Sequence, residues 1–257
     1  RVIGVEIKQL YQWTLRGLLH RLANKLANSS HMASPKLSSK CRQWINRLEK
    51  RAVSRCIRAN KGVILSSGGF IFNRDMVRQH LPEFLPARML GQAGDNGAGI
   101  ALGVSAGGVM KEMHSASAWR FINPPKTWPQ GIVVNLAGQR YCDEASYGAV
   151  IGTRMYRENL AQGMLIIDSE LYNNSTEFLS RDARSLISIV VNQQLKTAYQ
   201  ADTLEQLAEL TGIDSGNLLA TVELYNACAR GQQQDPFKKS PSDMSVIAKP
   251  PFYAIDL

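Results

Sequence analysis

Apolar positions along the chain follow two different periods, which together predict a protein of both strands and helices. From Ile57 onward, short apolar runs bounded by turn residues alternate with stretches of helical spacing, as is typical of an α/β chain. Strands are expected at Val2–Ile7, Val63–Leu65, Ile132–Val134, Arg140–Cys142 and Met164–Ile167. Helices are expected at Arg74–His80, within 94–113 after a glycine-rich turn, at 203–212 and at 214–230. Asp202 or Thr203 is expected to cap the third helix and Gly212 to end it, and Asp214 or Ser215 is expected to start the fourth. Turn residues Asn135–Gly138 predict that 132–134 and 140–142 form a hairpin.

The N-terminal part follows the helical period only. Within 9–27, one predicted helix face carries Tyr11, Leu15, Leu18, Leu19, Leu22 and Leu26. A second predicted helix, 41–56, carries Trp44, Ile45, Leu48 and Ala52 along one side. A polar loop, 28–39, with Pro35 joins the two. Such an amphipathic pair suits packing on its own domain, and it equally suits docking on a membrane interface or a partner.

Charge sharpens this picture because it is concentrated in the same region. Residues 8–61 hold 13 Lys or Arg and one acid, Glu49, which gives +12, whereas the other 203 residues sum to −3. A local positive field attracts anionic surfaces, either nucleic acid or acidic lipid headgroups. The helix–turn–helix pattern at 202–230 does not favour DNA, since its second helix offers no Lys or Arg before Arg230. We therefore expect no specific nucleic-acid partner and an anionic membrane surface as the partner of 8–51.

Composition limits the remaining classes. No run of about eighteen apolar residues occurs, and the N-terminus lacks the pattern of a signal peptide, so a cytoplasmic protein, at most bound at a membrane surface, is expected. Four cysteines without metal-ligand spacing predict reduced thiols and no metal site. Arg1 lies within an apparent strand and Leu257 follows another apolar run, so we expect a piece of a longer protein. The oligomeric state is not predicted.

The stretch "GVILSSGGFIFNRDM" (62–76) carries the first candidate for binding chemistry. Ser66, Ser67, Gly68 and Gly69 follow the predicted strand at 63–65. Small residues at the end of a strand allow main-chain amides to approach phosphate or ribose oxygens of a nucleotide. A tight structural turn is the alternative explanation.

Five motifs in order extend this candidate to a family. The stretch 62–76 is followed by "GDNGAGIALG", "GIVVNLAGQRYCDEASY", "TLEQLAELTGID…LLATVELYNACARG" and "PPFYAIDL". In this order the chain resembles the flavoproteins that include fumarate reductases and 3-ketosteroid dehydrogenases. The resemblance implies an α/β plus α+β fold in which a glutathione-reductase-like FAD-binding domain is interrupted by a capping domain. It implies that 1–7 and 52–115 belong to the FAD-binding domain, 8–51 is a basic helical insertion, 116–248 is the capping or substrate domain, and 249–257 return to the FAD-binding domain.

The resemblance also implies which residues hold FAD. They are Ser66, Ser67, Gly68, Gly69, Phe70, Asn73, Asp95, Asn96 and Gly97. Three family features are missing: the N-terminal GxGxxG fingerprint, the C-terminal segment that finishes the flavin pocket, and the aspartate of Gly-Asp-Gly, where this chain has Ala98. Asp95 or Asn96 is expected to substitute for that aspartate.

Tyr147 distinguishes the branches of the family. It matches the tyrosine of 3-ketosteroid dehydrogenases, closest to the 4(5α)-dehydrogenases, and is expected to serve as catalytic base or proton relay while flavin N5 accepts hydride from a steroid-like ketone. A packed tyrosine of the capping domain is the alternative. A flavin-dependent fumarate-reductase-type enzyme for unsaturated acids is disfavoured, because the Thr-Arg-Asp run after Glu144 is absent. A non-catalytic basic interaction module is the third reading. Arg140 and Glu144 are expected to be structural or near the flavin, and Tyr141 and Tyr253 to be packing residues.

Overall fold

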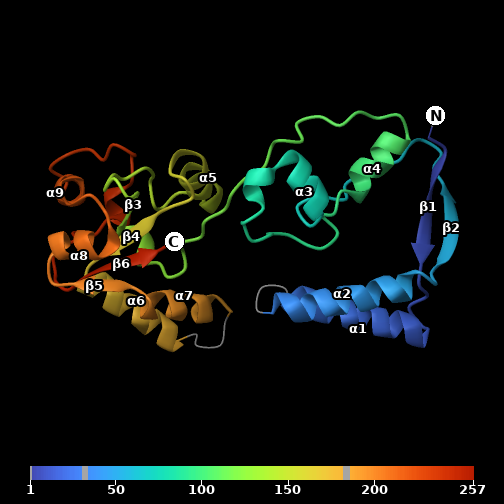
Figure 1. Ribbon diagram of the computed structural model, residues 1–257, viewed down its shortest axis with the longest axis horizontal. Helices are drawn as coiled ribbons and strands as arrows, with labels where there is room; N and C mark the ends of the chain where they lie inside the picture. Colours follow the sequence, from blue (N-terminus) through green and yellow to red (C-terminus); the bar gives the residue numbers. More distant parts are fainter. Residues whose placement is uncertain (1, 31–33, 182–185) are drawn as a thin grey trace. The chain divides into compact units, whose positions relative to one another are not determined.

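The protein is described from a computed structural model, which covers residues 2–30, 34–181 and 186–257. The chain divides into two units, Arg1–Ala116 and Ser117–Leu257. In Figure 1 they run from blue to green and from green to red. Within the described ranges no helix is long and apolar enough to cross a bilayer, and no group of three or more His, Cys, Asp or Glu side chains is placed to hold a metal.

Unit 1 begins with an antiparallel ribbon that carries a helical hairpin. Strand β1, Gly4–Gln9, pairs with β2, Val53–Arg58, and between them lie α1, Leu15–Ser30, and α2, Pro35–Glu49. The predicted strand and both predicted helices are confirmed, but their bounds differ. The second helix stops at Glu49 because 53–58 are taken up by the ladder to β1, in which Gln9 opposes Val53. Pro35 starts α2 rather than lying in a loop, and residues 31–33 of that predicted loop lie outside the described part.

The two helices of the hairpin meet through small residues. Ala23 and Ala27 of α1 are buried beside Ile45 of α2, and Ser38 Oγ donates a hydrogen bond of 2.8 Å to the Ala27 carbonyl. Small side chains let the two helix backbones approach closely. The larger apolar side chains of α1 are left outside this contact.

The rest of unit 1 is short helices and extended loops. Helix α3 spans Arg74–His80 as predicted, the 3-10 helix η1 spans Pro82–Phe84, and α4 spans Ala98–Ser105. The predicted buried strand Val63–Leu65 is wrong: these residues join no ladder, and Ile64 is 93% exposed. No strand in the described part of the chain pairs with this segment, and an apolar run without partner strands cannot be buried in a sheet.

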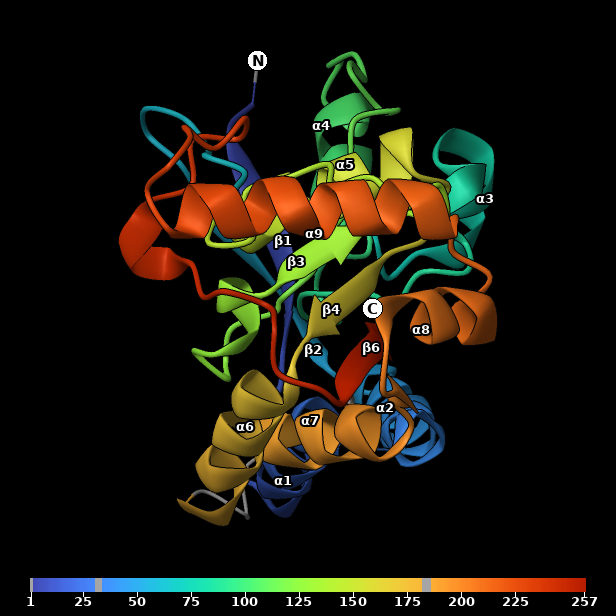
Figure 2. The ribbon, with the colours of Figure 1, turned by 90° about the vertical axis from the view of Figure 1, so that its left-hand side faces the viewer.

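Unit 2 is a four-stranded antiparallel sheet with helices on both faces. The strand order is β3-β4-β6-β5, formed by Ile132–Val134, Met164–Ile167, Phe252–Asp256 and Tyr199–Ala201. In Figure 2, α9 runs across the upper end of β3, and β4 lies below it. Residues 249–257, expected to return to the FAD-binding domain, here contribute β6 to this sheet. The predicted strand at 140–142 is reduced to a single bridge, Val134 to Arg140.

The strands of unit 2 serve two separate cores by simple alternation. Ile132, Val134 and Ile166 point to a core with α8, Leu204–Thr211, and α9, Ser215–Ala229. Val133, Leu165 and Ile167 point to the other face, covered by helices α5, α6 and α7, which span Gly148–Glu158, Ser169–Arg181 and Leu186–Lys196. The 3-10 helices η2, Trp128–Gln130, and η3, Pro241–Asp243, complete the unit.

The predicted helix caps in unit 2 are confirmed. Thr203 Oγ1 accepts a hydrogen bond from the Gln206 amide, and Gly212 ends α8 in the left-handed conformation with φ +72°. Asp214 then accepts from the Asn217 amide at 2.8 Å and starts α9. These contacts satisfy donors and acceptors that every helix end leaves unpaired.

Candidate functional site

The glycine segment 66–69 lies in unit 1 as exposed chain outside any helix or strand. Gly68 has φ +77°, a conformation that favours glycine, and a Cβ at this position would overlap the carboxylate of Asp95. Asp95 is held there because its Oδ2 accepts a hydrogen bond of 2.9 Å from the Gln92 amide. Gly68 is therefore required by its own backbone and by a neighbouring side chain of the same unit.

Gly69 is in a different situation. A Cβ added at Gly69 would meet no heavy atom within 4 Å, so this stretch of main chain is open to an approaching group. Its carbonyl accepts a hydrogen bond of 2.9 Å from the Gly97 amide, which ties 66–69 to the start of α4. Ser67 packs closely against Gly99: a Cβ added at Gly99 would overlap the Ser67 hydroxyl.

Asn73 and Asn96 join the same local structure through their side chains. Asn73 Oδ1 accepts from the Met76 amide and caps α3, while its Nδ2 donates to the Asn96 carbonyl at 3.1 Å. Asn96 Oδ1 accepts from the Ala98 amide at 3.0 Å. Phe70 is buried, with its ring edge-on to His80 at 5.8 Å. The structure thus brings the predicted cofactor residues of 66–73 and 95–97 together.

A pocket of about 450 Å³ opens beside these residues. Its lining comes from the start of α3 and the start of α4, and consists of Phe72, Asn73, Arg74, Met76, Asn96, Gly97, Ala98 and Ala101. Open main chain at Gly69 and a pocket at the N-terminus of α4 suit a ligand that presents phosphate or hydroxyl groups to backbone amides. The residues present therefore fit part of a dinucleotide such as FAD.

Tyr147 lies in unit 2, directly before α5, and its side chain is 65% exposed. Its ring packs edge-on against Trp119 at 4.6 Å between centroids, and Phe121 lies 5.5 Å from Trp119. The phenol is therefore not a packed core tyrosine, and it stands at the end of an exposed row of three aromatic rings. An exposed, ring-supported hydroxyl is available to a substrate.

Backbone contacts join the start of α5, next to Tyr147, to the segment 118–120. The Arg120 amide donates to the Gly148 carbonyl at 2.9 Å, and a Cβ at Gly148 or Gly152 would crowd the carbonyls of Arg120 and Ala118. These two glycines lie one turn apart on α5, so they form a flat strip against which 118–120 lies. The strip fixes Trp119 and Tyr147 relative to each other.

Unit 2 also contains a buried network of four charged side chains. The sequence analysis considered two of them, Arg140 and Glu144. Glu144 accepts hydrogen bonds from Arg140 Nε and Nη2 at 3.0 and 2.8 Å and from Lys239 Nζ at 2.9 Å. Arg140 also donates to Asp235 at 2.5 Å, and the Val133 amide donates to Glu144 at 2.9 Å. All four charged side chains are buried. Arg140 and Glu144 are thus structural within unit 2.

Burial and pairing act in opposite directions on the cations of this network. Burial lowers the pKa of Lys239, and its contact with Glu144 opposes the shift only in part. For Arg140 burial also acts to lower the pKa, but the hydrogen bonds to Glu144 and Asp235 outweigh it and raise the pKa. Tyr225 donates to the Gln130 carbonyl at 2.5 Å, and burial raises its pKa.

Asp235 and Lys239 were not identified from the sequence. They lie 95 residues from Arg140 and Glu144 and in no recognisable motif. The one signal was the run "DPFKK" in an otherwise weakly charged loop. Tyr141 and Tyr253 are packing residues as predicted: Tyr141 is buried in the second core, and Tyr253 stacks on Tyr172 at 3.9 Å.

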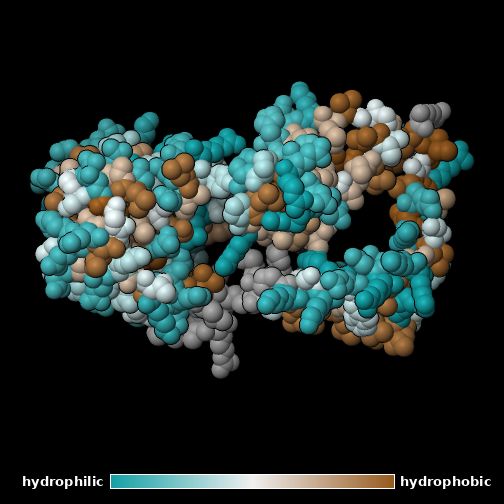
Figure 3. Space-filling view, viewed as in Figure 1, coloured by the Kyte–Doolittle hydropathy of each residue, from teal (hydrophilic) through white to brown (hydrophobic). Residues whose placement is uncertain are grey.

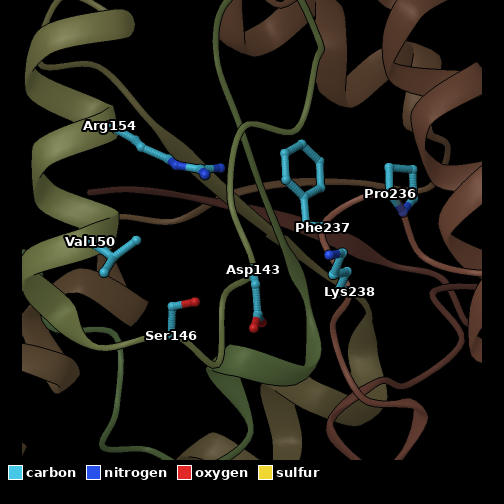
Figure 4. Close-up of a pocket in the computed structure, with 7 residues that line it drawn as sticks. All are labelled: Asp143, Ser146, Val150, Arg154, Pro236, Phe237 and Lys238. Carbon is cyan, nitrogen blue, oxygen red and sulfur yellow. The ribbon is translucent and has the colours of Figure 1, made fainter.

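A second pocket, of about 240 Å³, lies next to the network within unit 2 (Figure 4). Its lining comprises Asp143, Ser146, Val150, Arg154, Pro236, Phe237 and Lys238. In Figure 4, Arg154 extends from α5 toward the Phe237 ring, and its guanidinium lies 6.0 Å from the ring centroid. Arg154 also donates to the Tyr141 carbonyl at 2.8 Å, so this cation is already engaged.

Known proteins are similar to this chain over both of its units. A 3-oxo-5-alpha-steroid 4-dehydrogenase of Comamonas testosteroni is 30% identical over 269 aligned residues, covering 100% of this chain and 49% of that protein. An NADH:acrylate oxidoreductase of Vibrio harveyi is 29% identical over 77% of this chain and 20% of its own length. The chain spans about half the length of the Comamonas protein.

The fold has a solved counterpart. The crystal structure of 3-ketosteroid-delta4-(5alpha)-dehydrogenase from Rhodococcus jostii RHA1, in complex with 4-androstene-3,17-dione, matches with a TM-score of 0.65 and 27% identity. The match covers 80% of this chain and 41% of the Rhodococcus chain. The family of FAD binding domains matches residues 9–257. The chain therefore belongs to the FAD-binding domain family that contains 3-oxosteroid dehydrogenases and fumarate reductases, and its cofactor is FAD.

Proposed function

We propose that this chain is part of a FAD-dependent dehydrogenase of 3-ketosteroid-like substrates. The observation that carries the proposal is the exposure of Tyr147, whose ring packs on Trp119 in a row of aromatic rings; its sequence context resembles that of the family tyrosine. The similarity to the Comamonas 4-dehydrogenase over the whole chain supports the same substrate class.

The role of Tyr147 is proton transfer. Desaturation next to a ketone removes a hydride from the β carbon and a proton from the α carbon. FAD, when bound, supplies the hydride acceptor. The phenol oxygen of Tyr147 accepts the α proton while the hydroxyl releases its own proton to solvent, to which the residue is exposed, and its ring packs edge-on against Trp119.

The residues proposed to hold FAD in this chain are those of 66–73 and 95–97. The main chain at Gly69 offers open access, and Gly97 and Ala98 at the start of α4 line the adjoining pocket. Gly68 and Asp95 support this surface by fixing each other, and Asn73 and Asn96 hold the two loops together. Their part is to shape the surface that meets the dinucleotide.

Replacing Tyr147 by Phe in the full-length FAD-loaded enzyme tests this function. Removal of the proton-transfer group is expected to lower kcat on a 3-ketosteroid by about 10²–10⁴-fold, with KM and the flavin absorbance little changed. Tyr199→Phe is the matched control, because Tyr199 is also an exposed tyrosine of unit 2. Equal kcat in Tyr147→Phe and Tyr199→Phe would contradict the assigned role.

Reduction of an unsaturated acid is the second candidate. The similarity to the Vibrio acrylate oxidoreductase favours it. The arginine expected after Glu144 is absent, however, and Arg154, a cation of the small pocket, already donates to a backbone carbonyl. Assaying the full-length enzyme with fumarate and acrylate alongside the steroid separates the candidates. A third possibility, a non-catalytic basic module, requires that the full-length protein carry no flavin absorbance.

The basic segment 8–51 is proposed to hold the enzyme at an anionic membrane surface, on the cytoplasmic side. It carries ten Lys or Arg against Glu49 alone, and that acid is paired with His20 at 2.8 Å. Steroid-like substrates partition into membranes, so docking would raise their local concentration. Co-sedimentation of the full-length protein with anionic vesicles, with and without 8–51, tests this association. Equal binding by both forms would remove it.

A further inference from the structure

Helix α1 presents its leucines outward instead of using them to pack. Four leucines of α1 are exposed although this helix packs against α2: Leu15 at 74%, Leu18 at 47%, Leu22 at 56% and Leu26 at 47%. The contact with α2 is made by Ala23 and Ala27 on another side of α1. In Figure 3, brown surface runs along the lower edge of this hairpin beneath a teal face. The usual arrangement, with the largest apolar side chains in the helix–helix contact, is reversed.

The exposed leucines form one continuous stripe. At 100° per residue, the four fall within an arc of about 80° along α1. Trp13, which is 96% exposed, and Tyr11 lie just before the N-terminus of this helix. We refer to Tyr11, Trp13, Leu15, Leu18, Leu22 and Leu26 as the leucine face. A stripe this narrow with aromatic residues at one end has the plan of a helix that lies in a membrane interface.

Charges border the leucine face. On the helical wheel Arg21 and Lys25 lie on one side of the stripe, and Arg16 lies on the other. Helix α1 contains no acidic residue. Lys and Arg beside an apolar stripe can reach lipid phosphates while their stems cover apolar surface.

This charge pattern selects the occupant of the leucine face. A second copy of the chain would bring the same cations to the same border, with no acid on α1 to pair with them, so self-association through this face is opposed by repulsion. An anionic bilayer complements both the charges and the apolar stripe.

We propose that the leucine face of α1 inserts into the headgroup region of an anionic membrane, with α1 parallel to the bilayer plane. The inference rests on the proposed membrane association and adds the element that enters the lipid. Apolar side chains of such helices reach about 5–10 Å into the headgroup and acyl boundary. The contact between the small residues of α1 and α2 does not involve these leucines. The hairpin can therefore stay folded while the leucine side chains enter the lipid.

The test uses the full-length FAD-loaded protein and the double variant L18Q/L22Q. Loss of two inserted leucines is expected to weaken partition into phosphatidylcholine–phosphatidylglycerol vesicles by about 100-fold. L160Q/L210Q is the matched control, because Leu160 and Leu210 are exposed leucines of unit 2, and it is expected to bind as wild type. A wild-type far-UV circular dichroism spectrum shows that the double variant is folded.

Trp13 gives a second measurement that needs no leucine substitution. Its fluorescence is expected to shift to the blue on vesicle addition and to be quenched by brominated acyl chains, and W13F removes the quenching without abolishing binding. If L18Q/L22Q binds vesicles as wild type does, while deletion of 8–51 abolishes binding, the insertion of the leucine face is overturned and the membrane association is not. Retained binding after that deletion would overturn the membrane association itself. A dimer that dissociates only in L18Q/L22Q would assign the face to a second copy and also overturn the proposal.

Discussion

Glu144 offers the sharpest test of how unit 2 is held together. Its carboxylate is 1% exposed and accepts four hydrogen bonds, from the Val133 amide, from two nitrogens of Arg140 and from Lys239. Glu144→Gln keeps the shape of the side chain and removes its charge. It also places an amide donor where one carboxylate oxygen accepted hydrogen bonds from cations.

The expected loss follows from what each cation retains. Arg140 still has Asp235, whereas among the described residues Lys239 keeps two neutral acceptors, the Gly131 carbonyl at 2.9 Å and the Tyr225 hydroxyl at 3.3 Å. Removing one partner of a buried ion pair leaves an uncompensated charge and costs about 3–5 kcal/mol. We expect Glu144→Gln to lower the free energy of unfolding of unit 2 by about this amount.

Urea unfolding followed by tryptophan fluorescence measures this loss, because Trp128 is buried in unit 2. Glu170→Gln is the control: Glu170 pairs with Lys249 at the surface, and its loss is expected to cost less than about 1 kcal/mol. The double variant E144Q/K239M should recover part of the loss, since an apolar replacement removes the unpaired cation. A loss below about 1 kcal/mol in Glu144→Gln, with an unchanged m value, would refute the reasoning.

Four further outcomes are expected. Gly68→Ala should destabilise unit 1 by at least about 1–2 kcal/mol, because φ is positive there and the new Cβ overlaps Asp95, as thermal unfolding would show. Gly69→Ala should leave that stability within about 0.5 kcal/mol of wild type but lower the flavin content of the full-length protein, and normal flavin content would contradict open cofactor access at Gly69. In native protein at pH 8, an aromatic disulfide reagent should label the exposed Cys56 and leave the buried Cys142 unreacted until unfolding, so equal rates would show that the second thiol is accessible. Burial raises the pKa of the Cys142 thiol from its ordinary value of 9.0, so the unfolded state loses this proton first and the free energy of unfolding falls as pH rises above 9. In urea unfolding between pH 8 and 10, wild type should therefore lose about 1.4 kcal/mol more than Cys142→Ala. An equal loss in both proteins would refute the shift.

Local signals in the sequence were enough for the features that depend on near neighbours. The caps at Thr203 and Asp214, the left-handed Gly212 and the short helix ending before Pro82 all follow from contacts within a few residues. The strands at 132–134 and 164–167 were also predicted, because buried strands are apolar whichever partner they find.

Features that depend on distant partners were not predicted. The apolar run Val63–Leu65 has the composition of a strand, but a ladder needs a partner, and none lies in the described part of the chain. The second helix of the hairpin was predicted too long, because nothing in the sequence of Val53–Arg58 indicates that this segment pairs with β1. The charge network likewise joins 140–144 to 235–239, and no local pattern specifies that contact.

The glycine pair shows why one motif can carry two constraints. From the sequence, both glycines were expected to make room for the dinucleotide. In the structure Gly68 makes room for Asp95 and for its own positive φ, while only Gly69 leaves the main chain open. The two roles are physically linked, because fixing Gly68 against Asp95 sets the course of the chain that Gly69 then presents. Loss of Gly68 would therefore damage cofactor binding through the fold, and loss of Gly69 would damage it directly, so stability measured without cofactor distinguishes a residue that shapes the site from one that touches the ligand.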